Sequence, residues 1–217
     1  MNRVINAIGT GGPPLAVLAG GTANDFAGLV GAPWERDPAV RLAGSRRVRG
    51  IDLISVNGKL FATCGGIGLI PVAPGTWASV ATIPLAWGLH FLGGFALVGA
   101  ATVAVTVTGY LATARYLDGR AEDPSEVVID EVAGMLIALW PLSLGLTLAG
   151  SEPHVWPWPG WVLGFALFRF FDIVKPPPVG WADRLEGPLG VMLDDLVAGV
   201  LTAALATLAA GISHGWF

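Results

Sequence analysis

Charged side chains are scarce in this sequence. Asp, Glu, Lys and Arg make up 13% of its 217 residues, about half of the roughly 25% that is usual for a soluble domain. Hydrophobic residues make up 53% of the chain, which excludes a disordered protein. The formal net charge is −4, whereas nucleic-acid binding needs a basic surface. We therefore expect no nucleic-acid partner.

Cysteine is nearly absent as well. Cys64 is the single cysteine, so the chain cannot form an internal disulfide, and a small disulfide-bonded scaffold is excluded. We interpret Cys64 as a small buried hydrophobe rather than as a nucleophile.

Charge is missing altogether from several long stretches. Residues 60–114 contain no Asp, Glu, Lys or Arg, and the same holds for residues 132–151, 153–168 and 196–217. About 20 predominantly apolar residues are enough to cross the hydrocarbon core of a bilayer. The sequence therefore predicts a multi-pass membrane protein.

Five crossings are predicted from these stretches. Two lie within residues 80–114, with Gly93 and Gly94 at the bend between them. The other three cover residues 132–149, 156–171 and 196–212. The first and the fourth are short for full spans, so tilted or re-entrant segments are the alternative.

The N-terminal part has a different pattern. A short apolar run at residues 15–19 precedes two glycines, and residues 51–61 fit two strands around an Asn57-Gly58 turn, a pair that tolerates positive φ values. The predicted fold class is mainly α, with a helical membrane-embedded domain at 61–217 behind a small α/β unit at 1–60. Residues 73–77 are predicted to form a loop, because proline and glycine break both periodicities.

The spacing of the crossings brings the charged segments to one membrane face. If the 73–79 segment lies on one side, the stretches 115–131 and 172–195 both return to it. The positive residues that fall on this face are Arg115, Arg120, Arg169, Lys175 and Arg184. An excess of Lys and Arg marks the cytoplasmic side.

Two acidic pairs stand at the borders of apolar stretches. Asp130-Glu131 and Asp194-Asp195 each begin or precede an Asp-x-Val-Ala-Gly sequence, at 130–134 and 195–199. Charges at membrane depth are costly and mark functional sites by default. The small Ala-Gly steps allow two helices to approach closely, and this approach brings the acidic pairs together.

Four neighbouring carboxylates repel one another unless a cation lies among them. Mg²⁺ takes oxygen ligands and commonly shares substrate phosphates, so Asp130, Glu131, Asp194 and Asp195 are the predicted metal ligands. Four other polar side chains are predicted to bind a phosphate: Thr76, Ser79, Arg169 and Lys175. This combination points to phosphoryl chemistry on a lipid headgroup.

Structural explanations compete with this assignment. Acidic residues at a helix N-terminus are favoured by the helix dipole alone. Arg169 and Lys175 can also act as interfacial anchors whose charged ends reach water. The second acidic pair and Asp172 favour the metal site over these alternatives.

Four segments resemble the phosphatidylglycerophosphatase A family. They are residues 68–79 (GLIPVAPGTWAS), 128–135 (VIDEVAGM), 168–176 (FRFFDIVKP) and 190–199 (GVMLDDLVAG), in the order of the family. The resemblance covers about residues 61–213. It implies a Mg²⁺-dependent, mostly helical membrane enzyme that converts phosphatidylglycerophosphate to phosphatidylglycerol and phosphate.

The resemblance also implies which residues act and where the protein resides. The implied functional set is Asp130, Glu131, Asp172, Lys175, Asp194 and Asp195, while Pro74, Gly75, Thr76, Arg169 and Asp183 match the family pattern too. Pro177 departs from it, because the family often has an aromatic residue there. The implied location is the bacterial inner membrane, with the active site on the cytoplasmic face. The oligomeric state is left open, as is the choice between attack by water and an aspartyl-phosphate intermediate.

Residues 1–68 resemble part of a diacylglycerol-kinase-type catalytic domain. The similarity lies in residues 2–8, 14–27 and 49–68. The glycine-rich loop that cradles the nucleotide in that family is absent from the sequence, so kinase activity is not expected. A lipid kinase and a catalytically inactive membrane fusion protein are the two alternatives to a lipid phosphatase.

Overall fold

A computed structural model describes residues 60–117 and 126–215. Every regular element in these residues is a helix, and the described part contains no strand, which confirms the mainly α prediction. The predicted α/β unit at 1–60 lies almost wholly outside the described residues. Leu60 and Phe61 are helical, and the strand predicted for them is wrong. They begin a short helical turn in which the next residue, Ala62, is fully buried and its carbonyl accepts the Val128 N–H at 2.9 Å.

Helix α5 (Pro74–Leu117) is a helical hairpin and follows the short 3₁₀ segment η1 (Cys64–Leu69). It bends at the predicted place, where Gly94 has φ 58° and ψ −154°, a conformation that favours glycine. The Thr147 hydroxyl accepts the N–H of Phe95 at 3.0 Å and so caps the second arm.

The start of α5 corrects the loop predicted at 73–77. The helix begins at Pro74, because the first helical position needs no N–H and suits the fixed φ of proline. Gly75 and Thr76 therefore belong to the first turn of α5, whose early N–H groups have no partner within the helix.

Helices α6 (Ile129–Ala138) and α7 (Trp140–Leu148) together form the third apolar segment. Half of the most apolar window of 129–148 is buried, compared with 11% in α5 and 22% in α10. This segment is therefore the central one. Its buried side chains Met135, Leu136 and Leu139 form the core with Phe168 of α8.

Helices α8 (Trp158–Val174), α9 (Val179–Ala182) and α10 (Pro188–Ser213) complete the described chain. Within the described residues, three segments are long and apolar enough to cross a membrane: 74–115, 129–148 and 188–213. Helix α8 has 17 residues and is about 25 Å long, less than the roughly 30 Å of the hydrocarbon core. It fits the tilted or re-entrant alternative.

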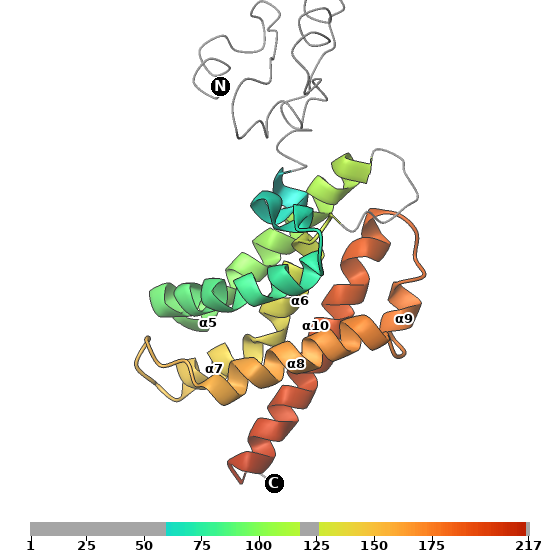
Figure 1. The fold of residues 1–217 in the computed structure, drawn as a ribbon. Coiled ribbons are helices and arrows are strands. Elements are labelled where there is room, and N and C mark those ends of the chain that lie inside the picture. The colour runs from blue at the N-terminus through green and yellow to red at the C-terminus, as the bar shows by residue number, and fades with distance from the viewer. Residues whose placement is uncertain (1–59, 118–125, 216–217) are drawn as a thin grey trace, which may run out of the picture. The chain divides into compact units, whose positions relative to one another are not determined.

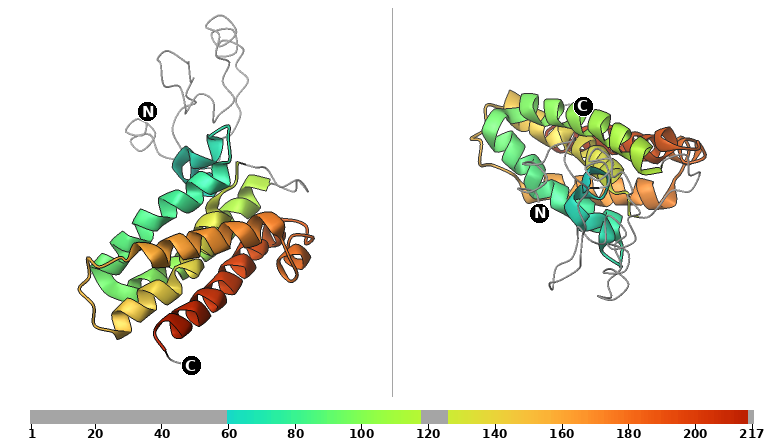
Figure 2. Two further views of the ribbon diagram at one scale, coloured as in Figure 1. Left: turned by 60° about the horizontal axis from the view of Figure 1, so that its bottom comes forward. Right: turned by 90° about the horizontal axis from the view of Figure 1, so that it is seen from above.

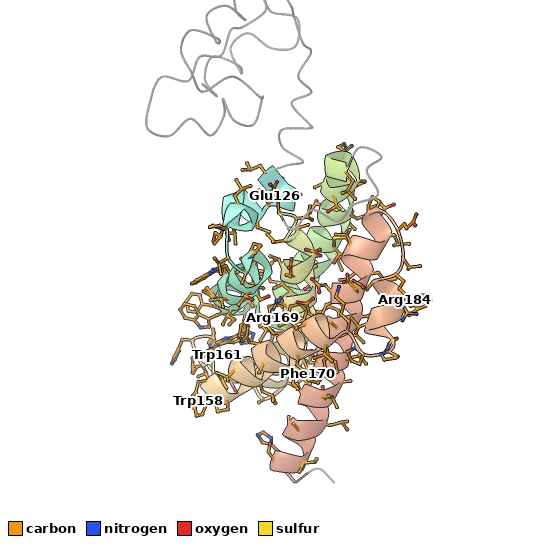
Figure 3. All side chains as sticks on the ribbon, turned by 45° about the vertical axis from the view of Figure 1, so that its right-hand side comes forward. Glu126, Trp158, Trp161, Arg169, Phe170 and Arg184 are labelled. Carbon is orange, nitrogen blue, oxygen red and sulfur yellow. The ribbon has the colours of Figure 1, made fainter. Side chains whose placement is uncertain are left out.

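The two ends of the helical unit differ in their chemistry. The α5 bend and the α7–α8 connection lie at the end near the C-terminus (Figures 1 and 2). Trp158 and Trp161 mark the start of α8 at that end, while Arg169 points inward farther along the helix (Figure 3). The opposite end gathers η1, the starts of α5, α6 and α10, and the end of α8 (Figure 2). The predicted convergence of the charged segments occurs there.

Candidate active site

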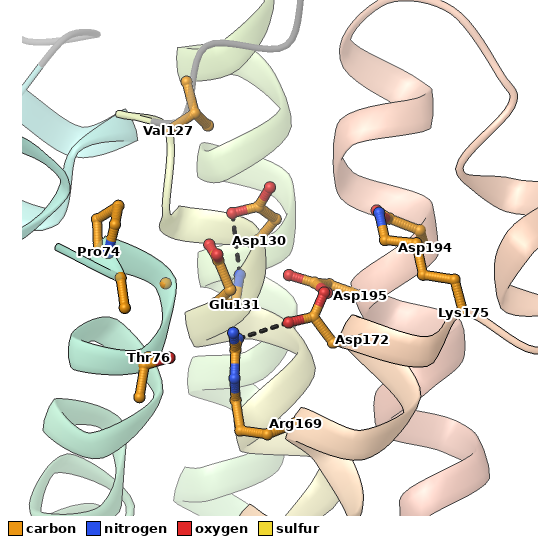
Figure 4. Close-up of a pocket in the computed structure, with 12 residues that line it drawn as sticks. Pro74, Thr76, Val127, Asp130, Glu131, Arg169, Asp172, Lys175, Asp194 and Asp195 are labelled. Atoms are coloured by element: carbon orange, nitrogen blue, oxygen red, sulfur yellow. Dashed lines mark hydrogen bonds and ion pairs between the residues drawn. The ribbon is translucent and has the colours of Figure 1, made fainter.

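A pocket of about 260 Å³ opens where four helices meet. Its polar lining comes from the first turns of α5 and α6, the last turns of α8 and the second turn of α10 (Figure 4). The lining residues are Ala73, Pro74, Gly75, Thr76, Val127, Asp130, Glu131, Arg169, Asp172, Lys175, Asp194 and Asp195. All six residues of the predicted functional set are therefore in one place.

Two glycines bring the acidic pairs together. A Cβ on Gly134 would lie 2.4 Å from the carbonyl oxygen of Asp195, and a Cβ on Gly199 would lie 2.4 Å from that of Gly134. The two Asp-x-Val-Ala-Gly sequences thus pack against each other backbone to backbone. This packing is the close approach of helices that the sequence predicted.

The carboxylates form two overlapping groups. Oxygens of Asp130, Glu131 and Asp195 lie within 4.8 Å of one another, and so do oxygens of Asp172, Asp194 and Asp195. Asp195 belongs to both groups and is 3% exposed. Asp130 also accepts the backbone N–H of Glu131 at 3.0 Å, which fixes its carboxylate at the start of α6.

The first turn of α5 lies directly over Glu131. A Cβ on Gly75 would lie 1.9 Å from Glu131 Oε1, so only glycine leaves room for this carboxylate. Thr76 lines the pocket beside it. The start of α5 therefore both shapes the acidic site and supplies polar groups to it.

Two cationic side chains face the acids. Arg169 Nη1 lies 2.5 Å from Asp172 Oδ2, one turn along α8. Lys175 Nζ donates to Asp194 at 2.8 Å and also to Asp183. Burial acts to lower the pKa of Lys175, but its bonds to the two carboxylates outweigh burial and raise the pKa above its usual value. The ammonium stays charged at neutral pH.

Several buried polar atoms of the pocket lack hydrogen-bond partners. Three buried atoms, Glu131 Oε2, Asp195 Oδ1 and Arg169 Nε, have no hydrogen-bond partner among the described residues. A native structure rarely leaves buried polar atoms unpaired, so each calls for an explanation such as an ion or a ligand. The carboxylate oxygens suit a cation, and the guanidinium suits an anion.

The charge balance supports the same conclusion. Five carboxylates and two cationic side chains line the pocket, an excess of three negative charges when all are ionised. Buried charge is tolerated when it is paired or coordinates a metal. The pocket therefore fits a hard divalent cation with oxygen ligands, such as Mg²⁺.

Ser79 is the predicted site residue that the pocket does not include. It is fully buried, and its hydroxyl donates to the carbonyl of Gly75 at 2.8 Å within α5. Val127 and Ala73 line the pocket although no chemical signal distinguished them. Asp183 holds Lys175 from outside the lining, and only its match to the family pattern had drawn attention to it.

Comparisons with known proteins agree with this chemistry. The profile of the family described as "Phosphatidylglycerophosphatase A" matches residues 60–210. The profile described as "Diacylglycerol kinase catalytic domain" matches residues 1–56. Both resemblances seen in the sequence are thereby confirmed. No solved structure matches the chain.

Three curated relatives cover most of the chain. A protein named phosphatidylglycerophosphatase A from Escherichia coli is 34% identical over 158 residues, which are 72% of this chain and 84% of the relative. One of the same name from Haemophilus influenzae is 36% identical over 143 residues, 65% of this chain and 81% of its own length. A "putative phosphatidylinositol-3-phosphatase" from Bacteroides thetaiotaomicron is 38% identical over 154 residues, 69% and 91% of the two chains.

Proposed function

The chain belongs to the phosphatidylglycerophosphatase A family, and from this premise we propose that it removes the terminal phosphate of phosphatidylglycerophosphate. Water and the phosphomonoester are consumed, and phosphatidylglycerol and inorganic phosphate are released. The observation that carries the proposal is the pocket in which five carboxylates and two cations meet at the ends of apolar helices.

The size and position of the pocket suit a lipid headgroup. Its volume of about 260 Å³ is below the roughly 300–1,000 Å³ of pockets that enclose drug-sized ligands. It therefore takes the phosphate and the adjoining atoms, while the acyl chains stay in the bilayer. The apolar flanks of α5 and α10 are largely exposed, as helices that face lipid are.

Mg²⁺ is the proposed cofactor, bound by carboxylates of the two acidic pairs. The unpaired oxygens Glu131 Oε2 and Asp195 Oδ1 support this assignment. A divalent cation supplies Lewis-acid polarisation of phosphate oxygens and lowers the pKa of bound water. Two of the carboxylates that would hold it, Asp130 and Asp195, are buried.

The protein's own cations take the phosphate. Arg169 Nε is buried and lacks an acceptor among the described residues, and a guanidinium can bind two phosphate oxygens at once. Lys175 adds a point charge, and its raised pKa keeps it protonated. Thr76 and the early N–H groups of α5 supply further donors, as helix N-termini do at phosphate sites. Charge that develops on the equatorial oxygens in the transition state is stabilised by these groups.

The proposed location is the bacterial inner membrane with the pocket on the cytoplasmic face. Arg115, Arg169, Lys175 and Arg184 belong to segments at the pocket's end of the helices, and the positive-inside rule assigns such an end to the cytoplasm. The membrane association itself rests on three helices of sufficient length and apolar character.

The proposal is tested by phosphate release from a panel of lipids. Purified full chain in detergent receives phosphatidylglycerophosphate, phosphatidylinositol 3-phosphate or phosphatidic acid, with Mg²⁺ or with EDTA. We expect Mg²⁺-dependent release that is fastest from phosphatidylglycerophosphate. Faster release from phosphatidylinositol 3-phosphate would replace the proposed substrate. ATP-dependent phosphorylation of diacylglycerol would support the lipid-kinase alternative. Folded protein that acts on none of the lipids would support the alternative of a catalytically inactive membrane fusion protein.

A further inference from the structure

The five carboxylates of the pocket differ in what they already bind. Within the described residues, the two buried carboxylate oxygens without a partner are Glu131 Oε2 and Asp195 Oδ1. Both belong to the group formed by Asp130, Glu131 and Asp195, whose oxygens lie within 4.8 Å of one another. Asp195 is 3% exposed, and its carboxylate lies between Glu131 and Asp172 (Figure 4), so it is shared by both carboxylate groups. The group of Asp130, Glu131 and Asp195 therefore contains buried hydrogen-bond acceptors that need a donor or a cation.

The other two carboxylates already have cationic partners. Asp172 Oδ2 lies 2.5 Å from Arg169 Nη1, and Asp194 Oδ2 accepts from Lys175 Nζ at 2.8 Å. Neither residue contributes an unpaired buried oxygen among the described residues. Each therefore has one cationic partner before any ion arrives, although Lys175 also binds Asp183.

Helix geometry explains why neighbouring acids have different partners. Successive residues of an α-helix are rotated by about 100°, so Asp194 and Asp195 cannot project in the same direction from α10. Asp195 faces the start of α6, where Gly134 allows the backbones to touch. Asp194 faces Lys175, whose left-handed backbone, with φ 48° and ψ 51°, ends α8.

We propose that the resident metal ion is held by Asp130, Glu131 and Asp195 alone, while Asp194 and Asp172 are positioning residues for Lys175 and Arg169. The proposal rests on the proposed phosphatase function and divides its site into an ion-binding half and a phosphate-binding half. It narrows the metal set expected from the sequence, which included Asp194.

The division follows from charge as well as from geometry. A divalent cation beside three carboxylates is well compensated and has oxygen ligands of the kind that Mg²⁺ prefers. A second resident ion at Asp172 and Asp194 would have to displace the guanidinium and the ammonium from their partners. Charge-assisted hydrogen bonds of this kind are about twice as strong as neutral ones, so the arrangement resists that displacement.

The test measures metal binding separately from turnover. Mn²⁺ is titrated into full-length protein in detergent without substrate and followed by electron paramagnetic resonance and calorimetry. One bound ion per chain is expected. Asp195→Asn is expected to weaken Mn²⁺ binding by about 100-fold or more, since even residues behind the ligands change metal affinity by 10–100-fold. Asp194→Asn is expected to weaken Mn²⁺ binding much less than Asp195→Asn does, because Lys175 is already paired with the Asp194 carboxylate. Glu152→Gln, in the α7–α8 connection, is the matched control.

A double-mutant cycle tests the positioning role. Asp194→Asn and Lys175→Gln are each expected to lower kcat/KM by about 10-fold or more, the effect of losing a hydrogen bond to a charged group. The double variant is expected to be no worse than Lys175→Gln, because residues that act through one another are not additive. Asp194→Glu, which keeps the charge, is expected to restore part of the activity.

Three results would overturn the division: two Mn²⁺ ions per chain without substrate, equal loss of Mn²⁺ affinity in the Asp194 and Asp195 variants, or fully additive effects in the cycle. Failure of the proposed function has a different signature. In that case the wild-type chain releases no phosphate from any lipid, whereas the Mn²⁺ titrations still report on the ion-binding half.

Discussion

Replacing Gly134 by alanine tests whether the backbone contact between α6 and α10 builds the site. The added Cβ would lie 2.4 Å from the Asp195 carbonyl oxygen and 2.7 Å from Phe168 Cε2, whereas ordinary contacts begin at 3.4 Å. Neither obstacle is the end of a flexible side chain, so the helices must separate by about 1 Å. Overpacking of this kind costs about 1–3 kcal/mol, against up to about 1 kcal/mol gained from helix propensity.

The separation also moves Asp195 away from Asp130 and Glu131. A misplacement of about 1 Å can lower the rate of a reaction about 100-fold. We therefore expect Gly134→Ala to lower both the melting temperature in detergent and the Mg²⁺-dependent phosphate release. Gly145→Ala in α7 is the control, because a Cβ there meets nothing within 4 Å and the helix gains stability. Wild-type stability and activity in Gly134→Ala would refute the reasoning.

Three further changes probe single features of the site. Gly75→Ala places a Cβ 1.9 Å from Glu131 Oε1, an end that can swing away, so we expect activity to fall with little change in melting temperature; equal loss of both would contradict this. Burial, with a smaller contribution from Glu131, raises the pKa of the Cys64 thiol to about 12. At pH 8 roughly one thiol in 10,000 is then ionised, and iodoacetamide should alkylate native protein far more slowly than denatured protein; similar rates would refute burial of the thiol. The raised pKa of Lys175 means that its ion pairs stabilise the fold below the unfolded value of 10.5 and are lost only as pH rises through the folded value. Lys175→Met should therefore lower the melting temperature by the same amount at pH 7 and pH 9. A smaller effect at pH 9 would contradict the raised pKa of Lys175.

Much of the architecture could be predicted because apolar length and glycine position leave few alternatives. Residues 80–114 were predicted to form two apolar segments with a bend at Gly93-Gly94, and α5 bends there. The repeated Asp-x-Val-Ala-Gly sequences indicated which helices touch, since small residues permit backbone contact. Each of these signals lies within a short stretch of the chain, so it can be recognised from the sequence alone.

Other features depended on contacts between distant residues and could not be predicted. Pro74 and Gly75 suggested a loop, yet Pro74 starts α5 because proline suits the first helical turn. The Ser79 hydroxyl looked available, but within a helix it bonds to the carbonyl four residues earlier. The partner of each acid could not be predicted either. It depends on which side of α10 packs against the end of α8, where Lys175 lies.

The most direct test of the account compares two carboxylate substitutions in one assay. Asp195→Asn removes the acid shared by both carboxylate groups, and Glu152→Gln removes an acid from the α7–α8 connection outside the pocket. Each folded variant is stripped with EDTA, and Mg²⁺ is then titrated back while phosphate release from phosphatidylglycerophosphate is measured. We predict that Glu152→Gln recovers wild-type turnover and that Asp195→Asn recovers none. Full recovery in Asp195→Asn would contradict the claim that this acidic pocket is the active site.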